Sequence, residues 1–141
     1  MAICQQFNNY LQYALVMADK IKSHRELKVY QMSFDVGMKI FNLSKTFPKE
    51  ETYSLTDQMR RSSRSVSANI AEAFRKRRYP KHFVSKLTDS EAESAETQVW
   101  LDYALACKYI NNENYEKLNK QYENIIGMLV NMSNHPEKWT W

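Results

Sequence analysis

Apolar residues recur every three or four positions along most of this chain, which is the spacing of one face of an α-helix. Five segments carry this pattern: residues 3–22, 27–46, 54–78, 80–110 and 114–132. The breaks between them contain helix-capping or helix-ending residues, namely Ser23 with Glu26 as a capping box, Pro48, Pro80 and the pair Asn111–Asn112. The sequence therefore predicts five helices with short connections.

Short connections between long helices make consecutive helices antiparallel neighbours. We therefore predict an all-α fold, an antiparallel up-down four-helix bundle with an additional N-terminal helix. Residues 1–24 would be the N-terminal helical extension, residues 25–133 the bundle and residues 134–141 a C-terminal tail. The chain has two glycines and three prolines, too few for the hairpin turns that a sheet protein of this length needs.

The chain has 141 residues, which suits a single domain with one core. No stretch of about 18 apolar residues is present, so we expect no membrane span, and the N-terminus lacks the order of a secretory signal. Cys4 and Cys107 lie in apolar helical patterns without metal-ligand spacing. They are predicted to be reduced, packed thiols of a cytoplasmic protein.

The three histidines do not support a catalytic or metal centre. None of His24, His82 and His135 follows a glutamate by three residues, so the paired Glu-x-x-His motif of di-iron bundles is absent from the sequence. No zinc-ligand spacing, recognisable triad or glycine-rich phosphate loop is present either. We therefore expect no enzymatic activity, no cofactor and no metal.

Two arginines of the third segment are predicted to lie beside two glutamates of the fourth. If the two segments form a hairpin that turns just before Pro80, Arg61 lies level with Glu96, and Arg64 lies level with Glu93. This register predicts the interhelical salt bridges Arg61–Glu96 and Arg64–Glu93. The third segment also has many small residues, which predicts a slim helix in close contact with its neighbours: Ser62, Ser63, Ser65, Ser67, Ala68, Ala71 and Ala73.

A cluster of basic residues follows the third segment. The candidate nucleic-acid ligands are Arg75, Lys76, Arg77, Arg78, Tyr79 and Lys81, with no acidic residue among them. One interpretation is a solvated helix end, since cations favour the C-terminal dipole of a helix. The other is a surface for phosphate backbones, with Tyr79 available for base stacking.

Several longer segments resemble a known family. They are ELKVYQ (Glu26 to Gln31), LSKTFPKEETYSLTDQMRRSSRSV (Leu43 to Val66), ANIAEA (Ala68 to Ala73) and KRRYPKHFVSKLTDSEAESAET (Lys76 to Thr97). These segments resemble the four-helix-bundle proteins encoded in intervening sequences of bacterial 23S rRNA genes. Relatives of that family include the accessory variability determinant of diversity-generating retroelements. The resemblance is strong from about Glu26 to Ile110 and extends to the last helix in pattern only.

The resemblance implies a homopentamer around a central channel and no established enzymatic activity. The retroelement relative is a basic pentamer that binds its reverse transcriptase and nucleic acid. We therefore expect a non-enzymatic, oligomeric protein whose partner is RNA, DNA or a nucleic-acid enzyme such as a reverse transcriptase. The alternative is a protein–protein interaction or structural module that does not bind nucleic acid, with a partner that docks on Tyr10, Tyr13, Trp139 or Trp141.

Overall fold

The structure, a computed structural model, describes residues 21–141. This part of the chain contains four α-helices and no strand: α2 (Lys28–Ser44), α3 (Leu55–Arg75), α4 (Pro80–Ala106) and α5 (Asn112–Asn134). Three short 3-10 turns complete it: η1 (His24–Glu26), η2 (Lys49–Glu51) and η3 (Pro136–Lys138). The all-α fold class is confirmed. The expected N-terminal helix falls almost wholly outside the described residues.

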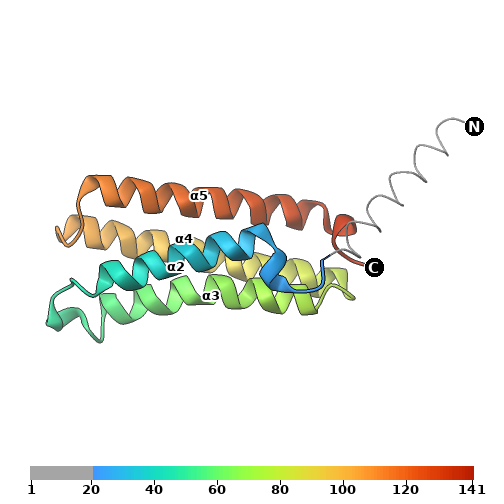
Figure 1. Ribbon diagram of the computed structural model, residues 1–141, viewed down its shortest axis with the longest axis horizontal. Helices are drawn as coiled ribbons and strands as arrows, with labels where there is room; N and C mark the ends of the chain where they lie inside the picture. The colour runs from blue at the N-terminus through green and yellow to red at the C-terminus, as the bar shows by residue number, and fades with distance from the viewer. Residues whose placement is uncertain (1–20) are drawn as a thin grey trace, which may run out of the picture.

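The four helices run alternately up and down beside one another (Figure 1). Each helix packs against its neighbours in the chain, and α5 closes the bundle by packing against α2. A hydrogen bond links that last pair, because Gln121 Nε2 donates to Asp35 Oδ2 over 3.3 Å. The bundle is therefore antiparallel, as predicted from the short connections.

Side-chain caps are present at the start of the turn η1 and of helix α5. The predicted capping box is present: Ser23 Oγ accepts from the amide of Arg25 at 3.3 Å, and Glu26 Oε2 accepts from the amide of Ser23 at 3.0 Å. The box caps the 3-10 turn η1, and α2 begins only after Leu27. The Asn111 side chain likewise accepts from the amide of Asn114 at 2.8 Å and starts α5.

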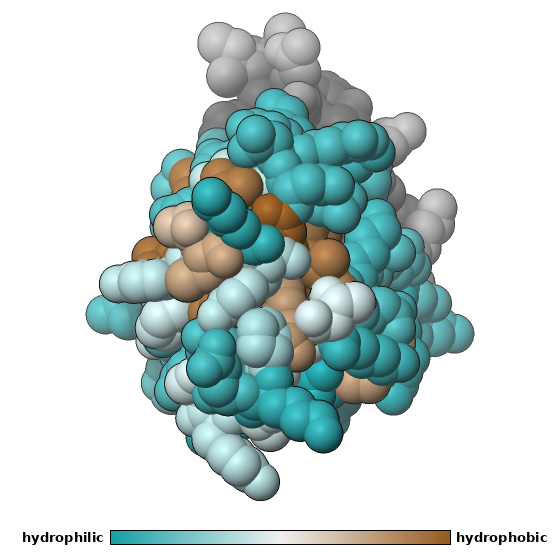
Figure 2. Space-filling model, turned by 90° about the vertical axis from the view of Figure 1, so that its left-hand side faces the viewer, coloured by the Kyte–Doolittle hydropathy of each residue, from teal (hydrophilic) through white to brown (hydrophobic). Residues whose placement is uncertain are grey.

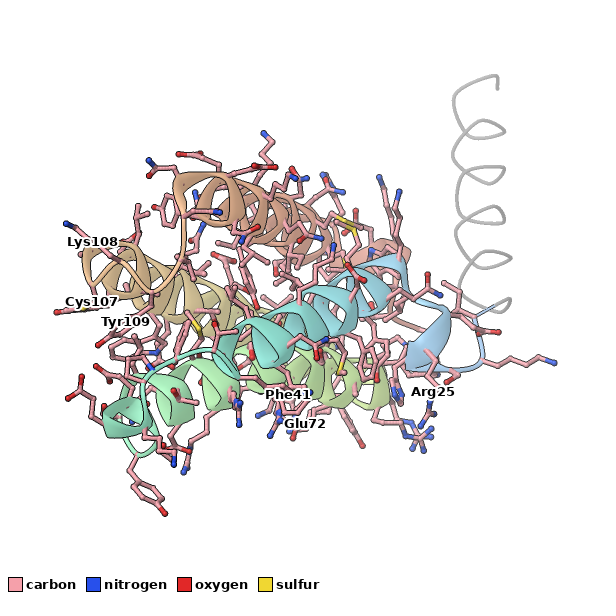
Figure 3. All side chains as sticks on the ribbon, turned by 60° about the vertical axis from the view of Figure 1, so that its left-hand side comes forward. Arg25, Phe41, Glu72, Cys107, Lys108 and Tyr109 are labelled. Carbon is pink, nitrogen blue, oxygen red and sulfur yellow. The ribbon has the colours of Figure 1, made fainter. Side chains whose placement is uncertain are left out.

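Helix α4 ends earlier than the apolar pattern predicts. It stops at Ala106, and the chain then turns through Lys108, whose φ of 62° lies in the left-handed region. Cys107 is consequently exposed at this turn and points outward beside Lys108 (Figure 3). The prediction that Cys107 is a packed thiol is therefore wrong, and Cys4 lies outside the described residues.

The core lies along the centre of the bundle and draws on all four helices. Its fully buried large side chains include Val36, Ile40, Met59, Ile70, Phe83, Leu87, Leu101, Tyr122, Ile125 and Leu129. At the end formed by the loops 45–54 and 107–111, hydrophilic residues surround a smaller apolar area (Figure 2). Within residues 21–141, no helix has the length and apolar character needed to cross a membrane.

Buried hydroxyl groups join α3 to α4. Ser90 Oγ donates to the carbonyl oxygen of Val66 at 2.8 Å, and the hydroxyl groups of Thr97 and Ser62 form a hydrogen bond of 2.8 Å. Ser62, Ser90 and Thr97 are at most 1% exposed. Small side chains with paired hydroxyls let the two helices approach closely without leaving these buried polar groups unpaired. This contact agrees with the slim third helix that the sequence predicts.

The hydroxyl of Tyr122 on α5 is different, because it is buried without a hydrogen-bond partner among residues 21–141. Burial raises the pKa of Tyr122 above its ordinary value of 10.0. The unfolded chain therefore ionises this tyrosine more readily than the folded protein does. This ionisation does not affect the free energy of unfolding below about pH 10, and it lowers the free energy of unfolding as the pH rises above that value.

We predict that Tyr122→Phe leaves the free energy of unfolding at pH 7 unchanged or raises it by about 1 kcal/mol, because an unpaired buried hydroxyl is removed. Between pH 9 and pH 11, the variant should lose less stability than the parent protein. Urea unfolding across this range measures both effects, and the remaining tyrosines titrate in both proteins. An equally steep alkaline loss in the two proteins would show that Tyr122 does not contribute.

Candidate nucleic-acid interface

The predicted basic cluster lies where α3 ends and α4 begins, in the turn 76–79. The amide of Lys76 donates to the carbonyl oxygens of Glu72 and Ala73 at 3.1 and 3.0 Å, which closes the last turn of α3. Pro80 then occupies the first turn of α4, a position that tolerates its missing amide hydrogen. We call the segment from Arg75 to Lys81 the basic end of the bundle.

Most side chains of the basic end are available to a ligand. Arg75, Lys76, Arg78 and Lys81 are exposed, and Tyr79 is 56% exposed with its ring 5.6 Å from that of His82. Within residues 21–141, no basic side chain of this segment forms an ion pair. The structure thus brings five of the six candidate ligands together on one surface.

Arg77 is the exception, since it is only 7% exposed. Its Nε donates to the carbonyl oxygen of Phe74 at 3.0 Å, and its guanidinium lies 3.7 Å from the centre of the Phe74 ring and 4.4 Å from that of Trp141. Burial, with a smaller contribution from the charge of Arg75, lowers the pKa of Arg77. Arg77 therefore attaches the C-terminal tail to α3 and is not an exposed phosphate ligand.

A cavity of about 380 Å³ opens at the basic end. It is lined by Phe74, Arg75, Arg77, Arg78, Tyr79 and Trp141. Three guanidinium groups and three aromatic rings thus surround it, and no acidic residue lines it. Such a lining is suited to an anion that carries a flat ring.

Arg25 also lies at this end of the bundle (Figure 3). The reason is the packing of η1, because the His24 ring meets the Phe74 ring edge-on at 6.4 Å and the Tyr30 ring at 4.8 Å. The sequence did not predict that Arg25 lies near the basic end, since Arg25 belongs to a short break between helices. The capping box around it was the only local sign that this break has a fixed structure.

The two predicted salt bridges are absent from the described residues. Arg61 Nη1 lies 3.9 Å from Asp57 Oδ2 on its own helix, and the Arg64 guanidinium lies 5.7 Å from the ring of Phe41 on α2. Neither Glu93 nor Glu96 forms an ion pair within residues 21–141. Burial, followed by the nearby charge of Glu96, raises the pKa of Glu93.

The predicted register is nevertheless close to the observed one. Ser62, the residue after Arg61, forms a hydrogen bond with Thr97, the residue after Glu96. Successive side chains of a helix point in directions about 100° apart, so Arg61 does not face α4 as Ser62 does. Arg61 therefore has the expected level but faces solvent. The ion pair that does link α3 to α4 joins Lys86 Nζ to Glu72 Oε2 at 2.9 Å, and its hydrogen bond raises the pKa of Lys86.

A second group of cations surrounds Phe41, which projects from α2 towards α3 (Figure 3). Lys45 Nζ and the guanidinium carbons of Arg60 and Arg64 lie 4.6, 4.9 and 5.7 Å from the centre of its ring. Arg60 Nε also donates to Ser44 Oγ at 2.7 Å. Phe41 lies within the apolar pattern of residues 27–46, and periodicity alone does not separate the core side of a helix from the adjoining groove.

Phe41 and Arg64 border a groove of about 310 Å³ between α2 and α3, which we call the α2–α3 groove. Gly37, Ala68 and Ala71 also line it, and these small residues leave room for an approaching surface. Phe34 and Met38 stand beside these residues and are 54% and 43% exposed. An apolar surface of this kind suits contact with another protein surface.

The model of the family described as 23S rRNA-intervening sequence protein matches residues 25–131. The chain belongs to this family. Residues 25–131 contain the basic end and nearly all of the α2–α3 groove, so both surfaces are formed by the family fold. Trp141, which lines the cavity, lies beyond the matched residues.

The chain is also similar to a solved structure. The relative is a protein with unknown function from the S23 ribosomal protein family of Bacteroides thetaiotaomicron VPI-5482. The two chains are 30% identical with a TM-score of 0.69, over 75% of this chain and 95% of the other. No match was found among curated proteins. The family and the fold are thereby shown.

Proposed function

We propose that this chain is a non-enzymatic, oligomeric helical-bundle protein of the cytoplasm that binds nucleic acid through its basic end. The observation that carries this proposal is the exposed group of Arg75, Lys76, Arg78 and Lys81 around Tyr79, without ion-pair partners among residues 21–141. These cations would contact RNA or DNA phosphates, and Tyr79 offers a stacking surface. A nucleic-acid enzyme such as a reverse transcriptase is the protein partner that the family resemblance implies.

The charge of the chain supports a modest affinity for each copy. The net charge is +4, and the four cations that have no ion pair among residues 21–141 provide only a few phosphate contacts. An oligomer would place several basic ends on one assembly, and a single strand that reaches two of them binds more tightly than either site alone. The proposed function therefore depends on assembly as well as on the basic end.

The test is fluorescence anisotropy with a labelled single-stranded RNA at about 50 mM salt. The variant Arg75→Gln, Lys76→Gln, Arg78→Gln, Lys81→Gln should bind at least about tenfold more weakly. The slope of log affinity against log salt concentration should become shallower by about 0.7 for each phosphate that the variant no longer neutralises. These side chains are exposed, so the variant should remain folded.

A matched control removes the same charge elsewhere. Lys49, Lys108, Lys117 and Lys120 are exposed and lie away from the basic end, and their replacement by Gln should change the affinity much less. Equal losses of RNA affinity in the two quadruple variants would show that binding depends on net charge alone and not on the basic end. Absence of binding by the parent protein would refute the proposal.

The α2–α3 groove supports self-association, and a second copy is the partner that we propose for it. We predict that Phe34→Glu lowers the oligomeric mass measured by light scattering, because a charge would be buried in an apolar contact. The family resemblance implies a pentamer as the parent state. Tyr53→Glu is the matched control, since Tyr53 is 94% exposed and lies near the other end of α3. A monomeric parent protein, or an unchanged mass for Phe34→Glu, would contradict this assignment.

The same groove favours a second candidate function, a protein-interaction or structural module without nucleic-acid binding. Of the aromatic residues proposed for docking such a partner, Trp139 is half-buried and Trp141 contacts Arg77, while Tyr10 and Tyr13 lie outside the described residues. A protein partner that is lost in Phe34→Glu, together with absence of RNA binding by the parent protein, would select this alternative.

A further inference from the structure

We propose that the cavity at the basic end holds an unpaired nucleobase, so that the protein selects single-stranded over duplex nucleic acid. This inference rests on the proposed function and adds the chemical class of the ligand. Phosphate contacts alone do not distinguish the two forms in this way, because the denser charge of a duplex favours its binding to cations. Selection for a single strand requires a site for the base itself.

The walls of the cavity supply such a site. Tyr79 and Trp141 both line it, and they are 56% and 62% exposed, so each ring offers surface to a ligand. A nucleobase stacks on such rings regardless of its sequence, since every base has an aromatic face. In a duplex both faces of an internal base are already covered by its neighbours, so only an unpaired or terminal base can reach these rings.

Trp141 is held in place by the buried arginine. The Arg77 guanidinium lies 3.7 Å from the Phe74 ring and 4.4 Å from the Trp141 ring, which connects the exposed tryptophan to a phenylalanine that is 4% exposed. The cationic guanidinium interacts favourably with the ring faces. The tryptophan ring is therefore positioned before any ligand arrives, which reduces the entropy lost on binding.

The size and charge of the cavity agree with this ligand. Its volume of about 380 Å³ falls in the range of small-molecule sites, about 300 to 1,000 Å³. Arg75 and Arg78 line the same cavity, so the phosphates on either side of a captured base would meet exposed guanidinium groups. No acidic side chain lines the cavity to repel them.

The experiment compares a labelled single-stranded RNA of about 12 nucleotides with a duplex of the same length, by anisotropy at several salt concentrations. The parent protein should prefer the single strand. Tyr79→Leu and Trp141→Leu should each weaken single-strand binding by about 5- to 160-fold, the range that corresponds to loss of one base–aromatic stack. Duplex affinity and the salt slope should not change, because no charge is removed.

Tyr53→Leu is the control for removal of an exposed aromatic ring away from the site. Tyr79→Phe and Trp141→Phe should keep most of the affinity, since a ring remains at each position. Thermal unfolding should give similar midpoints for the Tyr53 and Tyr79 variants, because these side chains are exposed. Trp141→Leu also loses the contact with the Arg77 guanidinium, so Trp141→Phe, which keeps a ring there, is its matched comparison for stability.

The outcomes separate this inference from the proposed function. Equal or stronger duplex binding, with single-strand affinity unchanged in both Leu variants, overturns the base site. The proposed function survives that result if the quadruple Gln variant still loses binding. If neither RNA binds the parent protein, both proposals fail.

Discussion

Replacing Arg77 with alanine should lower the free energy of unfolding by about 2 to 4 kcal/mol, an unusual loss for one arginine in a basic cluster. The variant loses a charged hydrogen bond to the Phe74 carbonyl oxygen, which contributes about 1.5 to 3 kcal/mol in comparable cases. It also loses the contacts of the guanidinium with the rings of Phe74 and Trp141. Urea unfolding at pH 7 measures the loss.

The neighbouring residue is the matched control. Arg78 is exposed, so Arg78→Ala should change the free energy of unfolding by no more than about 0.5 kcal/mol. The same substitution should weaken RNA binding, because Arg78 is one of the proposed phosphate ligands. If both alanine variants lost the same stability, Arg77 would have no special structural role.

The Phe83→Ala variant should lose about 3 to 5 kcal/mol of stability, as is typical when a large aromatic side chain leaves a cavity in a core. Phe83 is 1% exposed in the first turn of α4, and its amide donates to the carbonyl oxygen of Tyr79 at 2.9 Å. The loss is a large part of the whole stability of a small domain, which is about 5 to 15 kcal/mol. Chemical unfolding followed by circular dichroism is the measurement.

Tyr53→Ala provides the comparison for Phe83, because it removes an aromatic side chain that is 94% exposed. Its stability should stay within about 0.5 kcal/mol of the parent value. A loss below about 1 kcal/mol in Phe83→Ala would contradict the assignment of Phe83 to the core.

The fold could be predicted from local signals because each of them acts over a few residues. The apolar spacing of three and four predicted four helices that the structure contains, and Pro80 marked the start of α4 correctly. The Ser23–Glu26 box is present, but it caps the turn η1 and not α2. The end of α4 was predicted too late. The apolar residues Tyr109 and Ile110 continue the pattern, but the chain turns at Lys108 and packs them from a loop.

The candidate site was predictable in composition but not in the roles of its members. The sequence shows the basic residues from Arg75 to Lys81 but does not show that Arg77 faces inward. That distinction depends on Trp141, which is far away in the chain and returns to α3 through the tail. The group around Phe41 was missed for a related reason, since Lys45, Arg60 and Arg64 reach that ring from two helices.

The predicted salt bridges are absent from residues 21–141 because the position of a residue along a helix does not determine the direction in which its side chain points. The hairpin register placed Arg61 and Arg64 at nearly the correct positions along the length of α4. The close contact between the helices is instead filled by hydroxyl side chains such as Ser62 and Thr97, and the arginines lie to one side. A register alone, without the face, does not identify ion pairs.

The paired hydroxyls between α3 and α4 have a consequence for the mechanics of the hairpin. A shift of α4 along α3 by one turn, about 5.4 Å, would break the Ser90–Val66 and Thr97–Ser62 hydrogen bonds, and the buried Ser90 hydroxyl would lose its partner. Sliding of one helix past the other is therefore costly. The turn 76–79 is therefore held by a rigid pair of helices, and a partner that binds there should find the same conformation in the free and the bound protein.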